Sequence, residues 1–128
     1  SLMNSPSIGC QYDIHHAIIE GFTSWQSGLR AMAPYIRTIC VKDFIYSQND
    51  GKWRIKEVPM GEGVVNFQTF FDILKEERIQ VPVSVHYEFF PIGKSFDVLS
   101  KEEKKKQLFS VAKKEAELLK SFIAQISS

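Results

Sequence analysis

The sequence lacks a long hydrophobic run, a strong net charge and a set of cysteines. No apolar segment approaches the roughly 20 residues that cross a bilayer, and the N-terminus lacks the basic-then-apolar order of a signal peptide. Sixteen Lys and Arg against fifteen Asp and Glu leave a formal charge of +1, too little to attract nucleic acid or an anionic membrane. We therefore expect neither of these partners, and a small ligand instead.

Cys10 and Cys40 are the only cysteines, too few for a disulfide framework. Each lies in an apolar, strand-like run, where small buried thiols are common, so we expect two free thiols and a reducing, cytoplasmic setting. A length of 128 residues suits one domain over residues 1–128. Ser1 and Leu2 precede Met3 and are candidate cloning residues outside the fold.

What the sequence does contain is an alternation of strand-like and helix-like segments. Apolar or β-branched runs predict strands over residues 8–12, 36–44 and 81–89. The second strand leads into a loop that carries an Asn-Asp-Gly triplet at 49–51, which is typical of a tight turn.

A segment with helical spacing of apolar residues follows each predicted strand. The first is capped by Thr23 or Ser24, and the second by Asn66. The third opens with a capping box made by Ser100 and Glu103. We interpret the lysines of this helix as a solvent-exposed face and not as a nucleic-acid-binding patch. The opposite, core-facing side of this helix is expected to hold Leu108, Val111, Ala112, Leu119, Phe122, Ile123 and Ile126.

The order strand, helix, strand, helix, strand, helix predicts an α/β fold with parallel strands and right-handed crossovers. A doubly wound sheet and a piece of a (β/α)₈ barrel both satisfy this order, and both bind ligands at the carboxyl ends of the strands. The three predicted strand ends should therefore bring their polar residues to one rim: Asp13, His16, Lys42, Asp43, His86 and Glu88.

Each of these groups also has an ordinary structural interpretation. Asp13 and His16 form a D-x-x-H arrangement that can bind a divalent metal and a substrate hydroxyl, but Asp13 can equally cap the following turn. Lys42 and Asp43 can form a strand-end ion pair. His15 is expected to face away from the site and to be structural.

Three other features of the sequence bear on ligand binding. The Gly-Glu-Gly stretch at 61–63 is too short for a phosphate loop, so a turn is expected that presents Glu62 to solvent or to the site. Trp53 and Tyr46 flank the loop after the second strand and can wall a sugar-sized pocket. His86 lies in an otherwise apolar strand, where an inward-pointing imidazole would need a partner, and Glu88 is expected to be its same-side neighbour.

Four segments resemble the C-terminal part of the xylose isomerase-like TIM barrels, the sugar-phosphate isomerase and epimerase family. In order, they are YDIHHA, ICVKDF, VPMGEGVVNFQTFFDILKE and PVSVHYEF. The resemblance covers nearly the whole chain. Its most specific part is the Lys-Asp pair followed by P-x-G-E-G-x-V-x-F.

The resemblance implies a barrel with one divalent metal (Mn, Mg, Co or Zn) at its carboxyl rim, and proton transfer next to a sugar carbonyl through an enediolate. By position, Asp13 resembles the metal-binding aspartate after strand six and His16 the histidine that contacts substrate. Cys40 stands where family members have a metal-binding histidine, and His86 where they have a metal-binding, catalytic glutamate. The candidates are therefore His86 and Glu88 for catalysis, Asp13, Cys40 and His86 for metal, and His16, Lys42, Asp43, Glu62 and Trp53 for substrate.

The match covers only strands six to eight, a partial (β/α)₈ barrel. Such a piece is expected to expose two strand edges and an apolar inner face, at a cost on the order of 10 kcal/mol. We therefore expect a homo-oligomer or a complementary partial-barrel chain. The expected function is part of an isomerase or epimerase site for a sugar or sugar phosphate. The alternative is a non-catalytic, self-associating barrel remnant or a carbohydrate-binding module.

Overall fold

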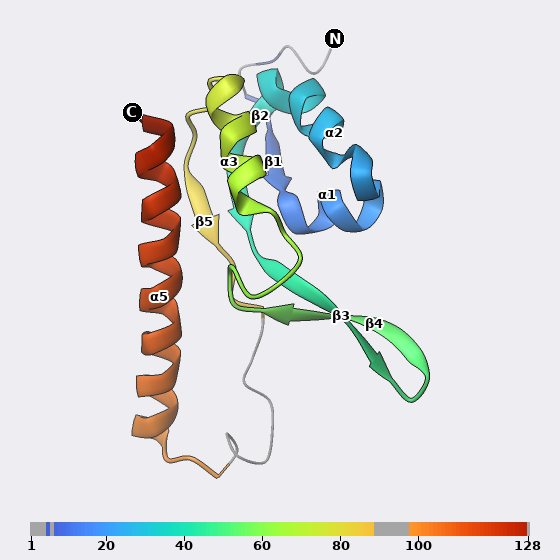
Figure 1. The fold of residues 1–128 in the computed structure, drawn as a ribbon. Coiled ribbons are helices and arrows are strands. Elements are labelled where there is room, and N and C mark those ends of the chain that lie inside the picture. Colours follow the sequence, from blue (N-terminus) through green and yellow to red (C-terminus); the bar gives the residue numbers. More distant parts are fainter. Residues whose placement is uncertain (1–4, 6, 89–97, 128) are drawn as a thin grey trace.

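Parallel strands form the central sheet of the chain (Figure 1). The computed structural model describes residues 5, 7–88 and 98–127. Strand β2 (Ile36–Val41) lies between β1 (Cys10–Asp13) and β5 (Val83–Val85), and both pairings are parallel, as predicted. Strand β5 is shorter than the predicted 81–89, whose last residue lies outside the described residues. Within the described part of the chain, no helix has the length and hydropathy to span a bilayer.

Two helices, not one, follow β1. Helix α2 (Trp25–Met32) is the predicted one, but α1 (Ile14–Gly21) precedes it and begins directly at the strand end. Asp13 is the N-cap of α1, because its Oδ1 accepts hydrogen bonds from the backbone N–H of His15 at 3.0 Å and of His16 at 3.4 Å. The capping interpretation of Asp13 is thus confirmed, and the capped element is a helix where a turn was expected.

The caps predicted for the two later helices are confirmed. Helix α3 (Phe67–Glu76) begins after Asn66, whose side chain accepts a hydrogen bond from the backbone N–H of Thr69 at 3.0 Å. Helix α5 (Lys101–Ser127) opens with the capping box: the Ser100 N–H donates to Glu103 at 2.9 Å, and the Glu103 N–H donates to Ser100 Oγ at 3.3 Å. Local side-chain chemistry therefore fixes where these helices start.

The predicted loop after β2 is a β-hairpin. Strands β3 (Asp43–Asn49) and β4 (Lys52–Val58) pair antiparallel and project away from the sheet (Figure 1). The tight turn is confirmed, since Asp50 and Gly51 have φ of 50° and 72°, the left-handed pair that two-residue hairpin turns require. The hairpin thus starts at the carboxyl end of β2, next to the predicted rim.

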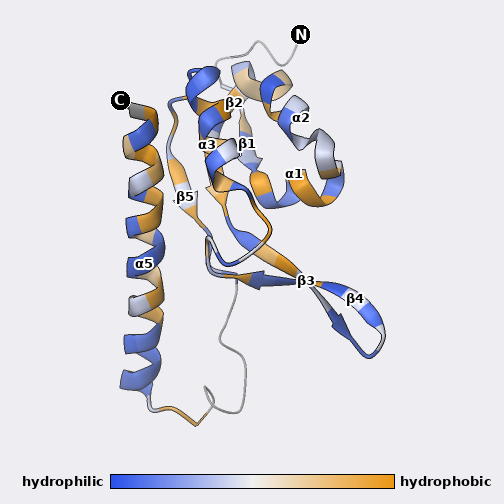
Figure 2. Ribbon diagram, viewed as in Figure 1, coloured by the Kyte–Doolittle hydropathy of each residue, from blue (hydrophilic) through white to orange (hydrophobic). Residues whose placement is uncertain are grey.

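Helix α5 packs its apolar side chains against the body mainly through its second half, and the first half adds a hydrogen bond of 3.4 Å from the Tyr87 hydroxyl to the Ala112 carbonyl. Phe122 stacks on Phe71 of α3, with ring centroids 5.0 Å apart, and Leu119 is buried. In the first half, Leu108 is 42% exposed and Phe109 66%, so the prediction that Leu108 faces the core is wrong. Figure 2 shows the hydrophilic start of this helix and the apolar residues further along it. The helix is simply longer than the surface that it covers.

The two faces of the sheet differ in polarity. Residues paired across parallel strands share a face and successive residues alternate, so Tyr12 and Ile39 point toward the helical core. The opposite, inner face carries Gln11, Asp13, Thr38, Cys40 and Ser84. Gln11, Thr38 and Ser84 are exposed. The expected apolar inner face is therefore wrong, and the stability cost assigned to leaving it uncovered does not apply.

Candidate functional site

The predicted polar strand ends meet around the ammonium group of Lys42. Its Nζ donates to Glu88 Oε1 at 3.0 Å and lies 3.2 Å from Asp13 Oδ2. Lys42 follows β2, Asp13 ends β1 and Glu88 follows β5, so each strand contributes one residue. Lys42 is only 7% exposed. Burial alone would lower the pKa of Lys42, but the hydrogen bond to Glu88 and the charge of Asp13 outweigh it and raise that pKa.

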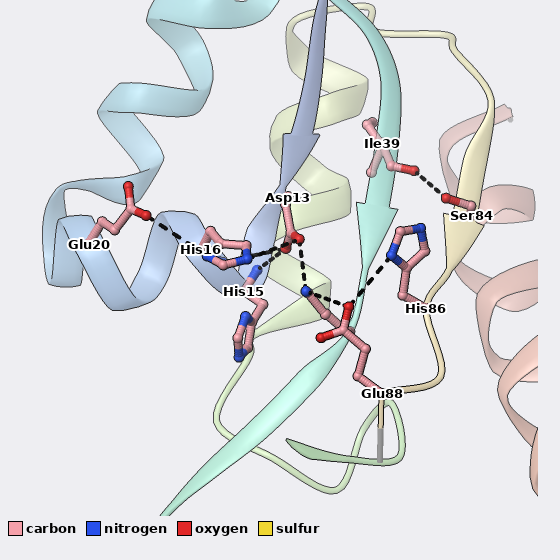
Figure 3. A network of polar contacts seen from close by, with 9 residues as sticks. Asp13, His15, His16, Glu20, Ile39, Ser84, His86 and Glu88 are labelled. Atoms are coloured by element: carbon pink, nitrogen blue, oxygen red, sulfur yellow. Dashed lines mark hydrogen bonds and ion pairs between the residues drawn. The ribbon is translucent and has the colours of Figure 1, made fainter. Parts of the chain in front are cut away.

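Two histidines flank this network (Figure 3). His86 Nδ1 lies 3.9 Å from Glu88 Oε1, and the His86 side chain is 41% exposed. His16 Nε2 lies 3.8 Å from Asp13 Oδ2, and its side chain is 57% exposed. These distances are too long for hydrogen bonds, so with respect to the described residues both imidazoles can contact another molecule at the rim.

Asp43 has a different environment from its neighbour Lys42. Its carboxylate is fully buried, and it accepts hydrogen bonds of 2.8 to 3.1 Å from the backbone N–H groups of Phe44, Gly61, Gly63 and Val65. The expected ion pair between Lys42 and Asp43 is therefore wrong, because Lys42 pairs with Asp13 and Glu88. Asp43 instead holds the Gly-rich loop in place.

Glycine is required at position 63 of that loop. A Cβ atom there would lie far inside van der Waals contact with the Asp43 carboxylate and the Phe44 carbonyl oxygen. The absence of a side chain lets the loop backbone approach Asp43 closely. The loop is therefore a turn that packs tightly around Asp43. It carries Glu62 as an exposed residue, whose negative charge raises the pKa of Glu115 in α5.

The remaining substrate candidate, Trp53, lies toward the tip of the hairpin. It is 70% exposed and pairs in register with Gln48 on β3. Tyr46, 45% exposed, lies nearer to the base of the hairpin, with its ring 5.4 Å from that of Phe44. Tyr46 and Gln48 are two residues apart on β3 and therefore lie on the same face of the hairpin. Trp53 lies directly opposite Gln48, so Trp53 and Tyr46 share that face.

His15 was not among the candidate site residues, yet it lies beside the rim. It is 5% exposed, and its ring lies edge-on to Phe44, with centroids 4.7 Å apart. Burial lowers the pKa of His15, and the positive charge of Lys42 lowers it further. Adjacent histidines give no signal of which one is buried, so the sequence offered only the expectation that His15 faces away from the site and is structural. Figure 3 shows its ring pointing away from the Asp13 carboxylate.

The donor set around Lys42 does not fit a divalent metal. Among the described residues, no three His, Cys, Asp or Glu side chains are grouped as ligands. Both cysteines are free thiols, and burial together with the charge of Asp13 raises the pKa of Cys40 to about 12, whereas the thiolate is the ligand form. A cation, the Lys42 ammonium, already stands between the carboxylates of Asp13 and Glu88.

Comparisons with known proteins agree with this architecture. The model of the xylose isomerase-like TIM barrel family matches residues 1–121. The crystal structure of a xylose isomerase domain protein from Planctomyces limnophilus is similar, with 27% sequence identity and a TM-score of 0.66. The match covers 97% of this chain and 40% of that one, so this chain spans less than half of its relative's length. No curated protein matches.

Strands β1, β2 and β5 form an open parallel sheet with helices, which is part of a TIM barrel and not a closed one. The fold class predicted from the strand order is thereby confirmed, and so is the resemblance of the Lys-Asp and P-x-G-E-G-x-V-x-F segments, which lie within the matched residues. The chain belongs to the xylose isomerase-like TIM barrel family.

Proposed function

We propose that the rim around Lys42 is one side of a sugar-binding site and that the chain contributes it to a sugar isomerase or epimerase. The observation that supports this best is the meeting of Asp13, Lys42 and Glu88 from three strand ends, within 3.2 Å of one ammonium nitrogen. TIM barrels bind their ligands at this end of the strands. Carboxylate, ammonium and imidazole groups together offer the donors and acceptors that a polyhydroxylated ligand needs.

In the proposed reaction, Lys42 donates a hydrogen bond to the carbonyl oxygen of the sugar. Glu88, whose side chain is 47% exposed, removes the proton from the carbon next to that carbonyl. The Lys42 ammonium stabilises the negative charge of the enediolate that results. Glu88 then delivers the proton to the former carbonyl carbon, which completes the isomerisation; epimerisation would need a second acid on the opposite face of the sugar, supplied by the complementary part of the barrel. His86, beside Glu88, transfers the hydroxyl proton between the two enediolate oxygens.

The charge balance of the rim favours an uncharged sugar over a sugar phosphate. The ammonium of Lys42 is already matched by the carboxylates of Asp13 and Glu88, which leaves no unpaired positive charge in this network for a phosphate. His16, exposed next to Asp13, is the proposed donor to a further hydroxyl. The remaining walls of the site would come from strands that pair with the edges of β1 and β5, either in a second copy or in a complementary chain.

Solvent deuterium exchange tests the proposed proton transfer. The chain is incubated with D-xylulose in D₂O, and the C–H signals next to the carbonyl are followed by proton NMR. Exchange is expected with the wild-type chain and should be lost in Glu88→Gln. Glu117→Gln is the matched control, because that carboxylate is 64% exposed on α5 and pairs only with Lys113 among its ionic contacts in the described chain.

Two other outcomes of the same experiment are informative. Sugar binding without exchange would support the alternative, a carbohydrate-binding module without catalysis. The proposed function would be contradicted if a pentose, its ketose and its ketose phosphate all failed to bind and none of them showed exchange.

A further inference from the structure

His15 is a buried polar side chain that lacks a hydrogen-bond partner in the part of the chain that the structure describes. The residue is 5% exposed, yet neither Nδ1 nor Nε2 makes a hydrogen bond. Buried polar atoms in native proteins are nearly always paired, because an unpaired donor or acceptor opposes folding. Each exception therefore calls for an explanation. One explanation is that the hydrogen-bond partner is a ligand, which is absent from the free chain.

The position of the ring places this unpaired group between the rim and the hairpin. The His15 backbone N–H is bound to Asp13 Oδ1 at 3.0 Å, which fixes the residue beside the Lys42 network. Its ring packs edge-on against Phe44 at the start of β3, and Phe44 contacts the half-exposed ring of Tyr46. Figure 3 shows the ring pointing away from the Asp13 carboxylate. A polar handle beside an aromatic wall thus extends the rim toward the hairpin.

The chemistry of this extension fits a sugar hydroxyl. A neutral imidazole offers one N–H donor and one nitrogen acceptor, and hydroxyl groups can satisfy both, whereas a phosphate dianion only accepts. The C–H face of a sugar ring can pack on the exposed Tyr46. We infer that His15 is a further ligand-contacting residue, whose ring nitrogens hydrogen-bond a hydroxyl of the bound sugar on the hairpin side of the rim. This inference rests on the proposed sugar-binding function.

The His16 ring is the aromatic neighbour of His15 on the rim side. It packs edge-on against His15, with ring centroids 5.2 Å apart, and it is 57% exposed. In the described structure its side chain makes only long ionic contacts, of 3.8 Å to Asp13 and to Glu20, so it can turn without breaking a short hydrogen bond. In the complex that we infer, His16 turns aside and the ligand reaches the His15 nitrogens.

Replacing His15 by phenylalanine tests the inference directly. His15→Phe keeps a planar ring against Phe44 and removes both nitrogens. Because no hydrogen bond is lost in the free chain, the melting temperature should stay the same or rise. The affinity for D-xylulose, measured by calorimetric titration, should fall at least about tenfold, the loss of one good hydrogen bond. His15→Asn keeps a donor and an acceptor and should retain more of the affinity.

Imidazole nitrogen NMR adds a readout that a purely structural role would not move. The chain has only three histidines, so the spectrum is simple to assign. Adding D-xylulose should shift the His15 nitrogen signals in the wild-type chain.

Each contrary result overturns a specific statement. Equal affinity of wild type and His15→Phe would overturn the inference and leave the proposed function intact. A large drop in melting temperature would show that the nitrogens are already paired in the free chain, and would overturn the premise. No binding of D-xylulose, D-xylose or xylulose phosphate to the wild-type chain would overturn both the proposed function and this inference.

Discussion

Glu115 of α5 accepts a hydrogen bond of 2.6 Å from the backbone N–H of Met60, and this contact joins the long helix to the loop before α3. Glu115 is 3% exposed, and its other oxygen, Oε2, has no hydrogen-bond partner in the described structure. Burial raises the pKa of Glu115, the hydrogen bond from Met60 opposes that rise, and the negative charges of Glu62 and Asp43 add to it. The charged form of Glu115 is thus disfavoured in the folded chain.

The stability of the chain should therefore fall as the pH rises through the raised pKa of Glu115. Between the ordinary pKa of 4.5 and the raised value, the folded state binds more protons than the unfolded state, so the free energy of unfolding decreases with rising pH. Glu115→Gln removes this titration and keeps an acceptor for the Met60 N–H. Melting temperatures measured from acidic to neutral pH should fall less steeply in the variant. Identical slopes would contradict the assignment.

Gly63→Ala should destabilise the chain by about 1–3 kcal/mol, the usual cost of forcing extra atoms into a packed site. The new methyl group would collide with the Asp43 carboxylate, which holds the loop through backbone N–H groups. Gly28→Ala is the matched control: no atom lies within 4 Å of its added Cβ in α2, so it should stabilise by about 0.5–1 kcal/mol. Urea unfolding measures both. A tolerated Gly63→Ala would argue against the tight Asp43 contact.

Mn²⁺ should not raise the melting temperature of the wild-type chain, because Lys42 already lies between the carboxylates of Asp13 and Glu88. Lys42→Met removes that buried cation, and it should lower the free energy of unfolding by about 1–3 kcal/mol in EDTA. Added Mn²⁺ should restore part of this loss, since divalent cations bind paired carboxylates.

Lys113→Met, on the exposed face of α5, is the control for the Mn²⁺ experiment and should change neither value by much. If Mn²⁺ stabilises the wild-type chain and Asp13→Ala abolishes the effect, the metal site implied by the family resemblance would be present after all.

Association of the chain is expected to involve strand edges and not the inner face of the sheet. In the described sheet, β1 and β5 are the outer strands, and their free backbone groups can pair with another strand. The inner face, with Gln11, Thr38 and Ser84 exposed, offers little apolar surface to drive stacking. Light scattering over a range of concentrations should show a dimer or a larger assembly. A monomer at every concentration would contradict this expectation.

Local chemistry explains which parts of the fold could be predicted. Asn66 and the Ser100–Glu103 box marked two helix starts correctly, because capping acts within a few residues. Helix α1 was missed because its cap, Asp13, was weighed as a turn residue and a metal ligand. The hairpin was missed although Asn-Asp-Gly marked its turn, because most of β4 is exposed and lacks the apolar pattern of a buried strand.

The candidate site was predictable in position but not in pairing. Parallel strands bring their carboxyl ends together, so the meeting of Asp13, Lys42 and Glu88 followed from the strand order. The sequence does not say which carboxylate a lysine binds, because that depends on how strands twist and pair. Glu115 had a usable signal that was overlooked: it stands four residues from both Val111 and Leu119, on the apolar side of α5.

Lys42 and Asp43 are consecutive residues whose side chains have different partners: Lys42 pairs with carboxylates at the rim, and Asp43 binds backbone N–H groups, most of them in the glycine loop. The Asp43 carboxylate is held by four backbone N–H groups, and this anchorage limits how far the adjoining peptide can move. The ammonium group that would meet the sugar carbonyl is thus preorganised before any ligand arrives, and little conformational entropy remains to be lost on binding. Loosening the glycine loop should weaken recognition at the rim without removing any of the groups proposed to touch the sugar.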